Sequence, residues 1–451
     1  MLPAPFTIAL VLTVVTFLLA FFLTPSTVGA LDRSLELLNF WQQGMWDKPL
    51  LAFAVQMMLM LVLGHALALT RPVDKFISYV TKFCTSTATA AGLVTLLTIM
   101  VALFNWGLGL IFGAILARKV GEHAARNGIP LNYALIGAAG YSGLMVWHGG
   151  ISGSAPITAS EDGHITELMK NASADVLAKL PDSVSFSETV FGSMNLTIMV
   201  TLIIILPGFM YFMGKRSKKL TVLPESKFDQ STPEFVEEEV VGAEKLDRSM
   251  LFAIFFGGVF ILYAIYLAIS LYPIKGLGFI SPNFINLVLL GLCLAIHGSV
   301  SRFLKAIDSA IGGASGILIQ FPLYFGIMGI MSSSGLVQVF SDFFVSISSE
   351  TTFPVYTFFS AGIVNVFVPS GGGQWGVQGP IILQAAAELG VSTSKAIMAL
   401  AYGDQLTNML QPFWALPLLG ITGLRAKSIL PYTVALMGVG ALIFISFLLI
   451  F

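Results

Sequence analysis

The sequence predicts an all-α polytopic membrane protein with two structural repeats, whose broken helices or re-entrant hairpins meet near the middle of the bilayer. Three observations support this fold class. Hydrophobic residues make up 56% of the 451 residues and charged residues only 10%, a composition typical of proteins with many membrane spans. Long apolar runs recur along the chain, and some are interrupted by glycine and proline. Polar residues also recur at matching spacings in the two halves.

The apolar runs define the expected membrane segments. A hydrocarbon core about 30 Å thick requires roughly 20 apolar residues per helix, so the chain is expected to contain about ten to twelve segments. They are predicted at residues 6–24, 51–69, 92–117, 132–158, 190–214, 249–271, 283–300, 312–335, 353–388 (broken), 396–420 and 428–450. The first run has no Lys or Arg before Arg33 and is too long for a secretory signal, so it is predicted to be a retained span.

Charged residues divide the chain into two halves. The basic connection 215–219 predicts a cytoplasmic loop, whereas the acidic connection 159–189 suits the opposite face of the membrane. Residues 1–214 are therefore predicted to form the first membrane repeat, residues 215–247 a polar cytoplasmic linker, and residues 248–451 the second repeat.

A shared order of polar residues and prolines connects the two halves. The first half contains Asn105, Tyr141 and Pro156, separated by 36 (141 − 105) and 15 (156 − 141) residues. The second half contains Asn365, Tyr402 and Pro417, separated by 37 (402 − 365) and 15 (417 − 402) residues. Transporters built from repeats bind their substrate where the repeats meet. The list of runs leaves open whether the repeats are inverted, because residues 84–91 could form a re-entrant turn.

The strongest functional signal is the segment 369–380, which contains the glycine triplet Gly371, Gly372 and Gly373. These residues predict a broken membrane helix. The freed backbone groups cannot face lipid, so they must line a protein cavity. A second half-helix that starts near Gln374 would point its free N–H groups and positive dipole end into that cavity, which suits an anion.

The distribution of cations limits the charge of that anion. None of the 23 Lys and Arg residues falls well inside an apolar run, so a monocarboxylate is a better candidate than a di- or tricarboxylate. Its predicted ligands are Asn105, Trp106, Gly107, Ser152, Asn365, Ser370, Gly371, Gly372, Gly373, Gln374, Trp375, Gln378, Gln405, Asn408 and Gln411. The aromatic residues Trp375, Phe413 and Trp414 could surround a short aliphatic tail. No catalytic residue, metal site or nucleic-acid partner is predicted.

Asp404 is the acidic residue that falls deep in an apolar run, where an ionisable group suggests a functional role by default. Burial favours the neutral carboxyl, so Asp404 could carry a proton, and His148 could relay one. Structural roles for both residues stay open. No cofactor is expected. A proton is the predicted co-transported ion, and Na⁺ is the alternative because unwound backbone carbonyls and amide oxygens also suit it.

The sequence also contains a short motif of an enzyme class unrelated to transporters. Gly150-Ile151-Ser152-Gly153 matches the Gly-x-Ser-Gly signature of intramembrane serine proteases, with His65 or His297 as the general base. Both histidines are otherwise expected at the membrane interface. The motif lies in residues 147–156, which predict a second glycine-rich break in the first half. The signature is weak in a chain with 44 glycines, and a protease would leave the other broken segment, 369–380, unexplained. Rings of charge and repeated carbonyl filters, which would indicate a pore, are not evident. A carrier without enzymatic activity is therefore the preferred interpretation.

Motifs in both halves resemble one family. They lie at residues 105–110, 149–154, 369–375, 378–380, 401–405 and 411–417. Over nearly the whole chain the sequence resembles the bacterial short-chain fatty acid transporters of the AtoE type. This resemblance implies a multi-pass symporter of the bacterial cytoplasmic (inner) membrane that imports acetoacetate, butyrate and similar monocarboxylates. The sequence is also similar to the broader ion-transporter group of anion carriers, and this similarity suggests inverted repeats. The expected partners are the substrate and the lipid bilayer, and a homodimer is a further option.

Overall fold

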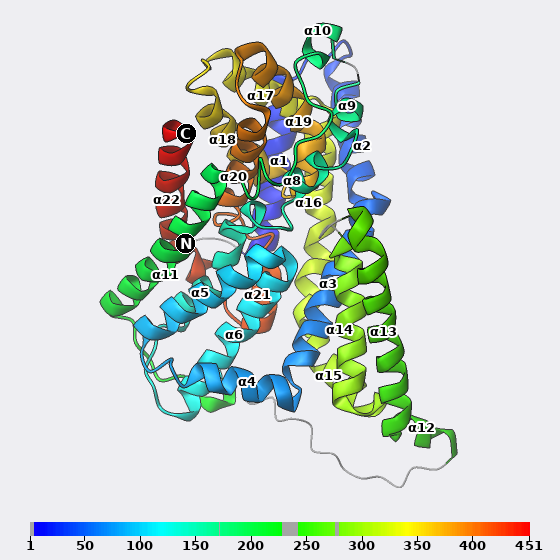
Figure 1. Cartoon of the computed structure of the whole chain (residues 1–451), viewed down its shortest axis with the longest axis vertical. Coiled ribbons are helices and arrows are strands. Elements are labelled where there is room, and N and C mark those ends of the chain that lie inside the picture. The colour runs from blue at the N-terminus through cyan, green and yellow to red at the C-terminus, as the bar shows by residue number, and fades with distance from the viewer. Residues whose placement is uncertain (1–3, 171, 228–241, 276–278) are drawn as a thin grey trace.

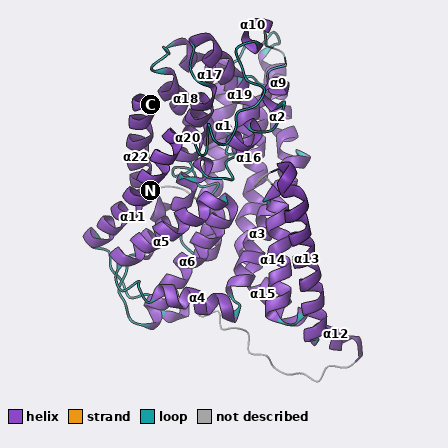
Figure 2. Cartoon of the chain, in the orientation of Figure 1, coloured by secondary structure: helices purple, strands orange, loops and turns teal. Residues whose placement is uncertain are grey.

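The computed structural model describes residues 4–170, 172–227, 242–275 and 279–451. These residues form helices joined by loops and include no β-strand (Figure 1, Figure 2). The predicted all-helical membrane class is confirmed. Seven helical runs of the described chain are long and apolar enough to cross a membrane: α1 (Pro5–Leu23), α3 (Lys48–Ala68), α5 (Thr87–Phe104), α11 (Ser193–Arg216), α13 (Met250–Lys275), the run Val300–Ser333 and α22 (Ala426–Ile450). The number of segments that cross the bilayer remains a prediction.

Three of the predicted runs are broken in the structure, and for two of them a break is also expected from the sequence, at the glycine-rich residues 147–156 and at Pro412 and Pro417. The run 92–117 is divided at Asn105 into α5 and α6 (Trp106–Arg126). The runs 132–158 and 396–420 each break into shorter pieces. These pieces are α7 (Tyr133–Tyr141), η1 (Ser142–Met145), η2 (Trp147–Gly149) and α8 (Ser154–Ala159) in the first run, and α20 (Thr393–Thr407) and α21 (Leu416–Thr422) in the second. Apolar composition alone does not locate these breaks, since they depend on caps and glycine contacts that only the folded chain reveals.

A further correction concerns the run 312–335, whose helix begins earlier. α15 (Val300–Ile311), η6 (Gly312–Ala314) and α16 (Ser315–Ser333) form one helical run of 34 residues. Arg302, which lies between two of the predicted spans, is therefore part of a helix. The N-terminus of α15 is capped by Ser299, whose hydroxyl accepts a hydrogen bond from the Arg302 N–H.

Several helices were not anticipated from hydropathy. α2 (Ala30–Met45) is amphipathic and packs on α16. The two backbones approach so closely that a Cβ at Gly44 would clash with the carbonyl oxygen of Phe325. The other helices not anticipated are α4 (Arg71–Thr81), α9 (His164–Leu168), α10 (Ala174–Leu177), η3 (Glu225–Lys227), η4 (Gly242–Glu244), α12 (Lys245–Arg248) and α17 (Leu336–Ser346). The predicted span 283–300 corresponds to α14 (Pro282–His297), and the predicted broken span 353–388 corresponds to α18 (Phe353–Phe367) and α19 (Gly371–Leu389).

The two halves of the chain interlock. In Figure 1, α1 and α2 of the first half lie against α16 of the second, whereas α14 and α15 of the second half lie against α3 of the first. Any site between the halves is therefore built by both. The proposed division into two repeats and a linker stays a prediction, and residues 228–241 of that linker lie outside the described residues.

The same order of elements occurs in each half. A helix, a break, two further helices, a second break and a short helix follow one another as α5, α6, α7 and α8, and again as α18, α19, α20 and α21. Each set includes a helix crossing at glycine: a Cβ at Gly113 would clash with the Gly140 carbonyl, and one at Gly403 with the Phe358 carbonyl. This shared order supports the predicted repeats and brings the four breaks toward the centre of the fold.

Candidate functional site

The break between α18 and α19 differs in detail from its prediction. The chain leaves the helix at Val368, Pro369 and Ser370, and the glycine triplet forms the first turn of α19. Ser370 caps this turn, because its hydroxyl accepts from the Gly373 N–H at 3.2 Å. First-turn N–H groups have no partner within a helix, so glycine costs little there. The dipole end of α19 therefore faces the break, as predicted.

Two ionisable side chains meet beside this helix end. His148 lies on η2 and Asp404 on α20, and each is at most 1% exposed. His148 Nε2 and Asp404 Oδ1 are 3.3 Å apart, within ion-pair range but without a well-aligned hydrogen bond. A Cβ added to Gly371 would lie 2.7 Å from His148 Nε2, so the imidazole rests against the start of α19. The two residues predicted to couple transport to an ion are thus in contact, at the helix break.

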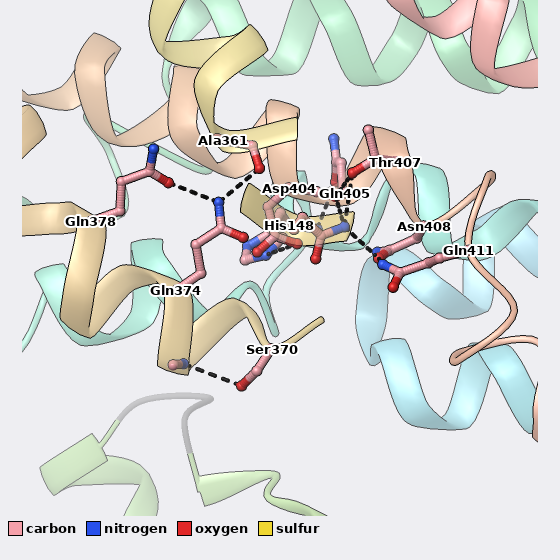
Figure 3. Close-up of polar contacts among 12 residues, drawn as sticks. His148, Ala361, Ser370, Gln374, Gln378, Asp404, Gln405, Thr407, Asn408 and Gln411 are labelled. Atoms are coloured by element: carbon pink, nitrogen blue, oxygen red, sulfur yellow. Dashed lines mark hydrogen bonds and ion pairs between the residues drawn. The ribbon is translucent and has the colours of Figure 1, made fainter. Parts of the chain in front are cut away.

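Amide side chains extend the site along α20. Asn365 on α18 donates through Nδ2 to the Asp404 carbonyl at 2.8 Å and to Asn408 Oδ1 at 3.0 Å. Gln411 Nε2 donates to the same Asn408 oxygen at 3.0 Å. Gln405 accepts from the His148 backbone N–H at 2.8 Å. Figure 3 shows His148, Asp404, Gln405, Asn408 and Gln411 next to a second hydrogen-bonded group, Gln374 and Gln378, and we call the two groups together with Asn365 the polar chain.

The other end of the polar chain lies on α19. Gln374 Nε2 donates to the Ala361 carbonyl and to Gln378 Oε1, both at 2.9 Å, and Gln378 Nε2 donates to the Ser360 hydroxyl at 2.9 Å. In Figure 3 the side chains of Gln374, His148 and Asp404 point toward one another. The two glutamines therefore fix α19 against α18, and they leave the Gln374 carbonyl oxygen free within the described structure.

Several buried polar atoms of the polar chain have no hydrogen-bond partner among the described residues. The oxygens are Asn365 Oδ1, Gln374 Oε1, Asp404 Oδ2 and Gln411 Oε1, and the nitrogens are His148 Nδ1, Gln405 Nε2 and Asn408 Nδ2. Leaving one such group unsatisfied costs about 1–3 kcal/mol. Their concentration in one place indicates a site that a polar ligand, an ion or water completes.

The first-half residues meet at the break between α5 and α6. Asn105 caps α6 by accepting from the Leu108 N–H at 2.9 Å, and Ser152 accepts from the Trp106 N–H at 3.0 Å. A Cβ at Gly107 would lie 2.8 Å from Met60 Sδ. The hydrogen bond between Ser152 and Trp106 therefore joins the two first-half breaks, whereas Asn105 caps α6 and Gly107 packs on α3. Contact of these four residues with a substrate stays a prediction.

An aromatic cluster joins this first-half break to the second half. The ring centroids of Trp106 and Trp147 are 5.7 Å apart, those of Trp106 and Trp414 5.1 Å, and those of Phe413 and Trp414 5.0 Å. Trp147 also touches the start of α19, since its ring would lie 2.8 Å from a Cβ at Gly371. The predicted apolar wall at Phe413 and Trp414 thus adjoins the helix break.

Trp375 lies elsewhere. Its indole N–H donates to His164 Nε2 at 2.9 Å, and its ring packs in a separate hydrophobic cluster with α8 and α9. Residues 374 and 375 point to different sides of α19, so the interpretation of Trp375 as part of the pocket wall is not supported by its contacts.

His65, expected at the interface, is buried at the end of α3. His297 is half-buried and contacts the Ala66 carbonyl at 3.0 Å.

Asn195 on α11 is a residue that sequence reasoning missed. Its Nδ2 donates to the Gly149 carbonyl at 2.9 Å and to the Val190 carbonyl at 2.7 Å, while its Oδ1 accepts from the Tyr402 hydroxyl at 2.8 Å. It therefore joins the break that carries His148 to the helix that carries Asp404. A single amide within the long apolar run of α11 was the available signal.

Replacing Asn195 by Ala is expected to lower the free energy of unfolding by about 2–4 kcal/mol, because three buried polar groups lose their partner. Tyr402→Phe removes one of these bonds and should cost about 1 kcal/mol. Thermal unfolding in detergent measures both effects. Asn127→Ala, at an exposed helix end, serves as the control and should change stability by about 0.5 kcal/mol or less. Equal stability of the Asn195 and Asn127 variants would contradict this role.

Comparison with known proteins identifies the family. The sequence profile of the family described as short chain fatty acid transporter matches residues 1–451. A protein of Haemophilus influenzae is 35% identical over 98% of this chain and 95% of its own length. A protein of Escherichia coli is 35% identical over 100% of this chain and 96% of its own length. Both are named for short-chain fatty acid transport, an assignment that their names mark as provisional.

Two solved structures were also found. The YdaH transporter of Alcanivorax borkumensis is 13% identical with a TM-score of 0.43, covering 98% of this chain and 97% of its own. MtrF of Neisseria gonorrhoeae, described in a class of antimetabolite efflux pumps, is 14% identical with a TM-score of 0.44, covering 100% of this chain and 95% of its own.

The family match and the apolar helices agree with the predicted location, a multi-pass protein of the bacterial inner membrane. The full-length profile match and the identity to both curated relatives exceed what a shared composition would give. The chain belongs to the short chain fatty acid transporter family.

Proposed function

We propose that this transporter imports short-chain monocarboxylates, such as butyrate and acetoacetate, together with a proton. The observation that supports this most is the buried contact of His148 and Asp404 against the first turn of α19. It combines a dipole end that favours an anion with two groups that can hold protons.

The carboxylate would bind at the start of α19. First-turn N–H groups supply hydrogen bonds there, and the capping hydroxyl of Ser370 shapes the turn. The buried nitrogens of Gln405 and Asn408 without described partners offer two more donors from α20. An anion can be held by such dipoles without a fixed cation, which suits one carboxylate better than two. The aromatic cluster of Trp147, Trp106 and Trp414 would receive the short aliphatic tail.

The proton follows from charge balance. With both ring nitrogens of His148 protonated, the imidazolium and an ionised Asp404 carboxylate together have no net charge. A bound monocarboxylate would then leave one uncompensated negative charge in a buried site, which is costly. Protonation of Asp404 beside the imidazolium removes that charge. Binding of the anion and binding of the proton therefore favour each other, as symport requires.

Uptake of labelled butyrate and acetoacetate into proteoliposomes tests this function. An inward proton gradient should drive accumulation above the level of protein-free liposomes, which report passive entry of the free acids. An inward sodium gradient alone should not. No protein-dependent accumulation of either acid under either gradient would remove the substrate assignment.

Sodium coupling is the second candidate, and one observation favours it. Four buried oxygens of the polar chain, on Asn365, Gln374, Asp404 and Gln411, have no partner among the described residues. Carboxamide and carboxylate oxygens are suitable ligands for Na⁺. Accumulation driven by the sodium gradient and unaffected by pH would favour this alternative over proton symport.

Ser152→Ala separates a carrier from the remote protease alternative. The Ser152 hydroxyl accepts from the Trp106 N–H, and no hydrogen bond to a histidine is found for it in the described part of the chain. We expect the variant to keep most of its uptake, with a loss of about 1 kcal/mol in stability from the missing cap. Cleavage of membrane peptides by the wild type that disappears in Ser152→Ala would instead support the protease.

A further inference from the structure

A groove opens at the protein surface close to the polar chain. Its volume is about 500 Å³, and the start of α1, η6, the start of α16, α21 and the start of α22 line it. Two exposed cations, Arg425 and Lys427, stand at its edge. The walls between them are glycines and aliphatic residues such as Gly313, Gly316 and Leu419. A small anion with an apolar tail matches such a combination of charge and apolar surface.

A small cavity is next to this groove and shares a lining residue with the polar chain. Its volume is about 30 Å³, room for one or two water molecules. It shares Ala426 and Lys427 with the groove and reaches Tyr141 and Gln411 on its inner side. The Tyr141 hydroxyl donates to the Asn408 carbonyl at 2.8 Å, and Gln411 donates to the Asn408 side chain. The cavity therefore ends where the polar chain begins.

We propose that the groove and the small cavity are the path by which the substrate leaves or reaches the polar chain, and that Lys427 receives the carboxylate at the mouth of this path. The inference rests on the proposed function, since it assumes an anionic substrate. A cation at a mouth with low-dielectric walls raises the local concentration of anions. The positive-inside rule assigns the basic connection between α21 and α22 to the cytoplasm, so this mouth would be the cytoplasmic one.

The charge of a second large cavity supports the groove beside Lys427, rather than that cavity, as the path of the anion. That cavity, of about 440 Å³, lies between α17 and α19 and is lined by the carboxylates of Asp342 and Glu388. It would repel an anion, whereas the groove beside Lys427 attracts one. The small cavity is too narrow for butyrate in this conformation. The small cavity is lined by Met409 to Pro412 and by the start of α22, including Ile429 and Thr433. Movement of the start of α22 away from residues 409–412 would widen it.

A cysteine placed in the groove tests the path directly. Ser315 is an exposed lining residue, and the native Cys84 and Cys293 are buried, so Ser315→Cys adds one accessible thiol. An anionic methanethiosulfonate should modify it faster than a cationic reagent of similar size, by roughly two- to fivefold, the effect of a unit charge about 10 Å away in water. Lys427→Gln should reduce this preference, Lys427→Glu should abolish it because Arg425 still supplies one positive charge at the same edge, and high salt should remove it.

Transport provides the second readout. Modified Ser315→Cys protein should lose uptake, whereas Ser392→Cys, an exposed site outside the groove, should not. Lys427→Glu should raise the KM for butyrate at this face, and Lys218→Glu, the same charge change elsewhere in the basic connections, should leave it unchanged. An unchanged reagent preference in Lys427→Gln, or full uptake after modification of Ser315→Cys, overturns the inference. If the wild type does not transport butyrate, the proposed function is refuted instead. The preference of Ser315→Cys for the anionic reagent would still show whether the groove attracts anions.

Discussion

Replacing Asp404 by Asn is expected to abolish accumulation of butyrate driven by a proton gradient. The amide keeps the size of the carboxyl and resembles its neutral form, but it cannot take up or release a proton. Its position beside His148, 3.3 Å away and shielded from solvent, leaves no nearby carboxylate to replace it among the described residues. Exchange of labelled for unlabelled butyrate should persist at a reduced rate and lose its pH dependence, because exchange needs no net proton movement.

The matched control is Asp308→Asn, which removes an exposed carboxylate on α15. It should accumulate butyrate as the wild type does, and exchange measured across a pH series compares the three proteins. Accumulation by Asp404→Asn at the wild-type level, with unchanged pH dependence, would remove Asp404 from proton coupling and leave it a structural role.

Exchanging a single glycine for alanine at the start of α19 should have the second largest effect. A Cβ at Gly371 would lie 2.7 Å from His148 Nε2 and 2.8 Å from the Trp147 ring, whereas a Cβ at Gly372 meets nothing within 4 Å. Overpacking of this kind costs about 1–3 kcal/mol, which corresponds to roughly 5- to 150-fold in the population of the competent arrangement. Uptake by Gly371→Ala should fall by that factor.

Gly372→Ala tests whether glycine is needed for conformational freedom or for space. Alanine is favoured over glycine within a helix by up to about 1 kcal/mol, so this variant should fold and transport as well as the wild type. Similar losses in both variants would mean that flexibility of the triplet is required. Normal uptake by Gly371→Ala would mean that the contact of His148 with α19 is not needed for transport.

The sequence predicted the position of the main break but not its exact bounds. Pro369 and three glycines suggested that the ladder ends within the triplet, yet Ser370 supplies a cap and the glycines become the first turn of α19. The difference arises because first-turn residues do not use their N–H groups in the ladder, so glycine is tolerated there. Composition marks a break, whereas the capping geometry decides at which residue it falls.

Site residues were predictable where burial of a polar group was itself unusual. Asp404 stood out as an acid in an apolar run, and the carboxamides of Asn365, Asn408 and Gln411 prove to be its neighbours along the polar chain. The contact of Asp404 with His148 could not be predicted, since 256 residues (404 − 148) separate them. The contact of Trp375 with His164 could not be predicted either, because neighbouring helical residues face different sides and the sequence does not define which side of α19 faces the break.

The measurement that tests the central claim most directly is proton movement coupled to substrate. Proteoliposomes with a trapped pH indicator receive butyrate outside, at equal pH on both sides and without sodium. Internal acidification should be faster with the wild type than with Asp404→Asn, which should match protein-free vesicles that report passive entry of butyric acid. Equal rates in all three, while labelled butyrate still enters faster with the wild type, would contradict proton symport through His148 and Asp404.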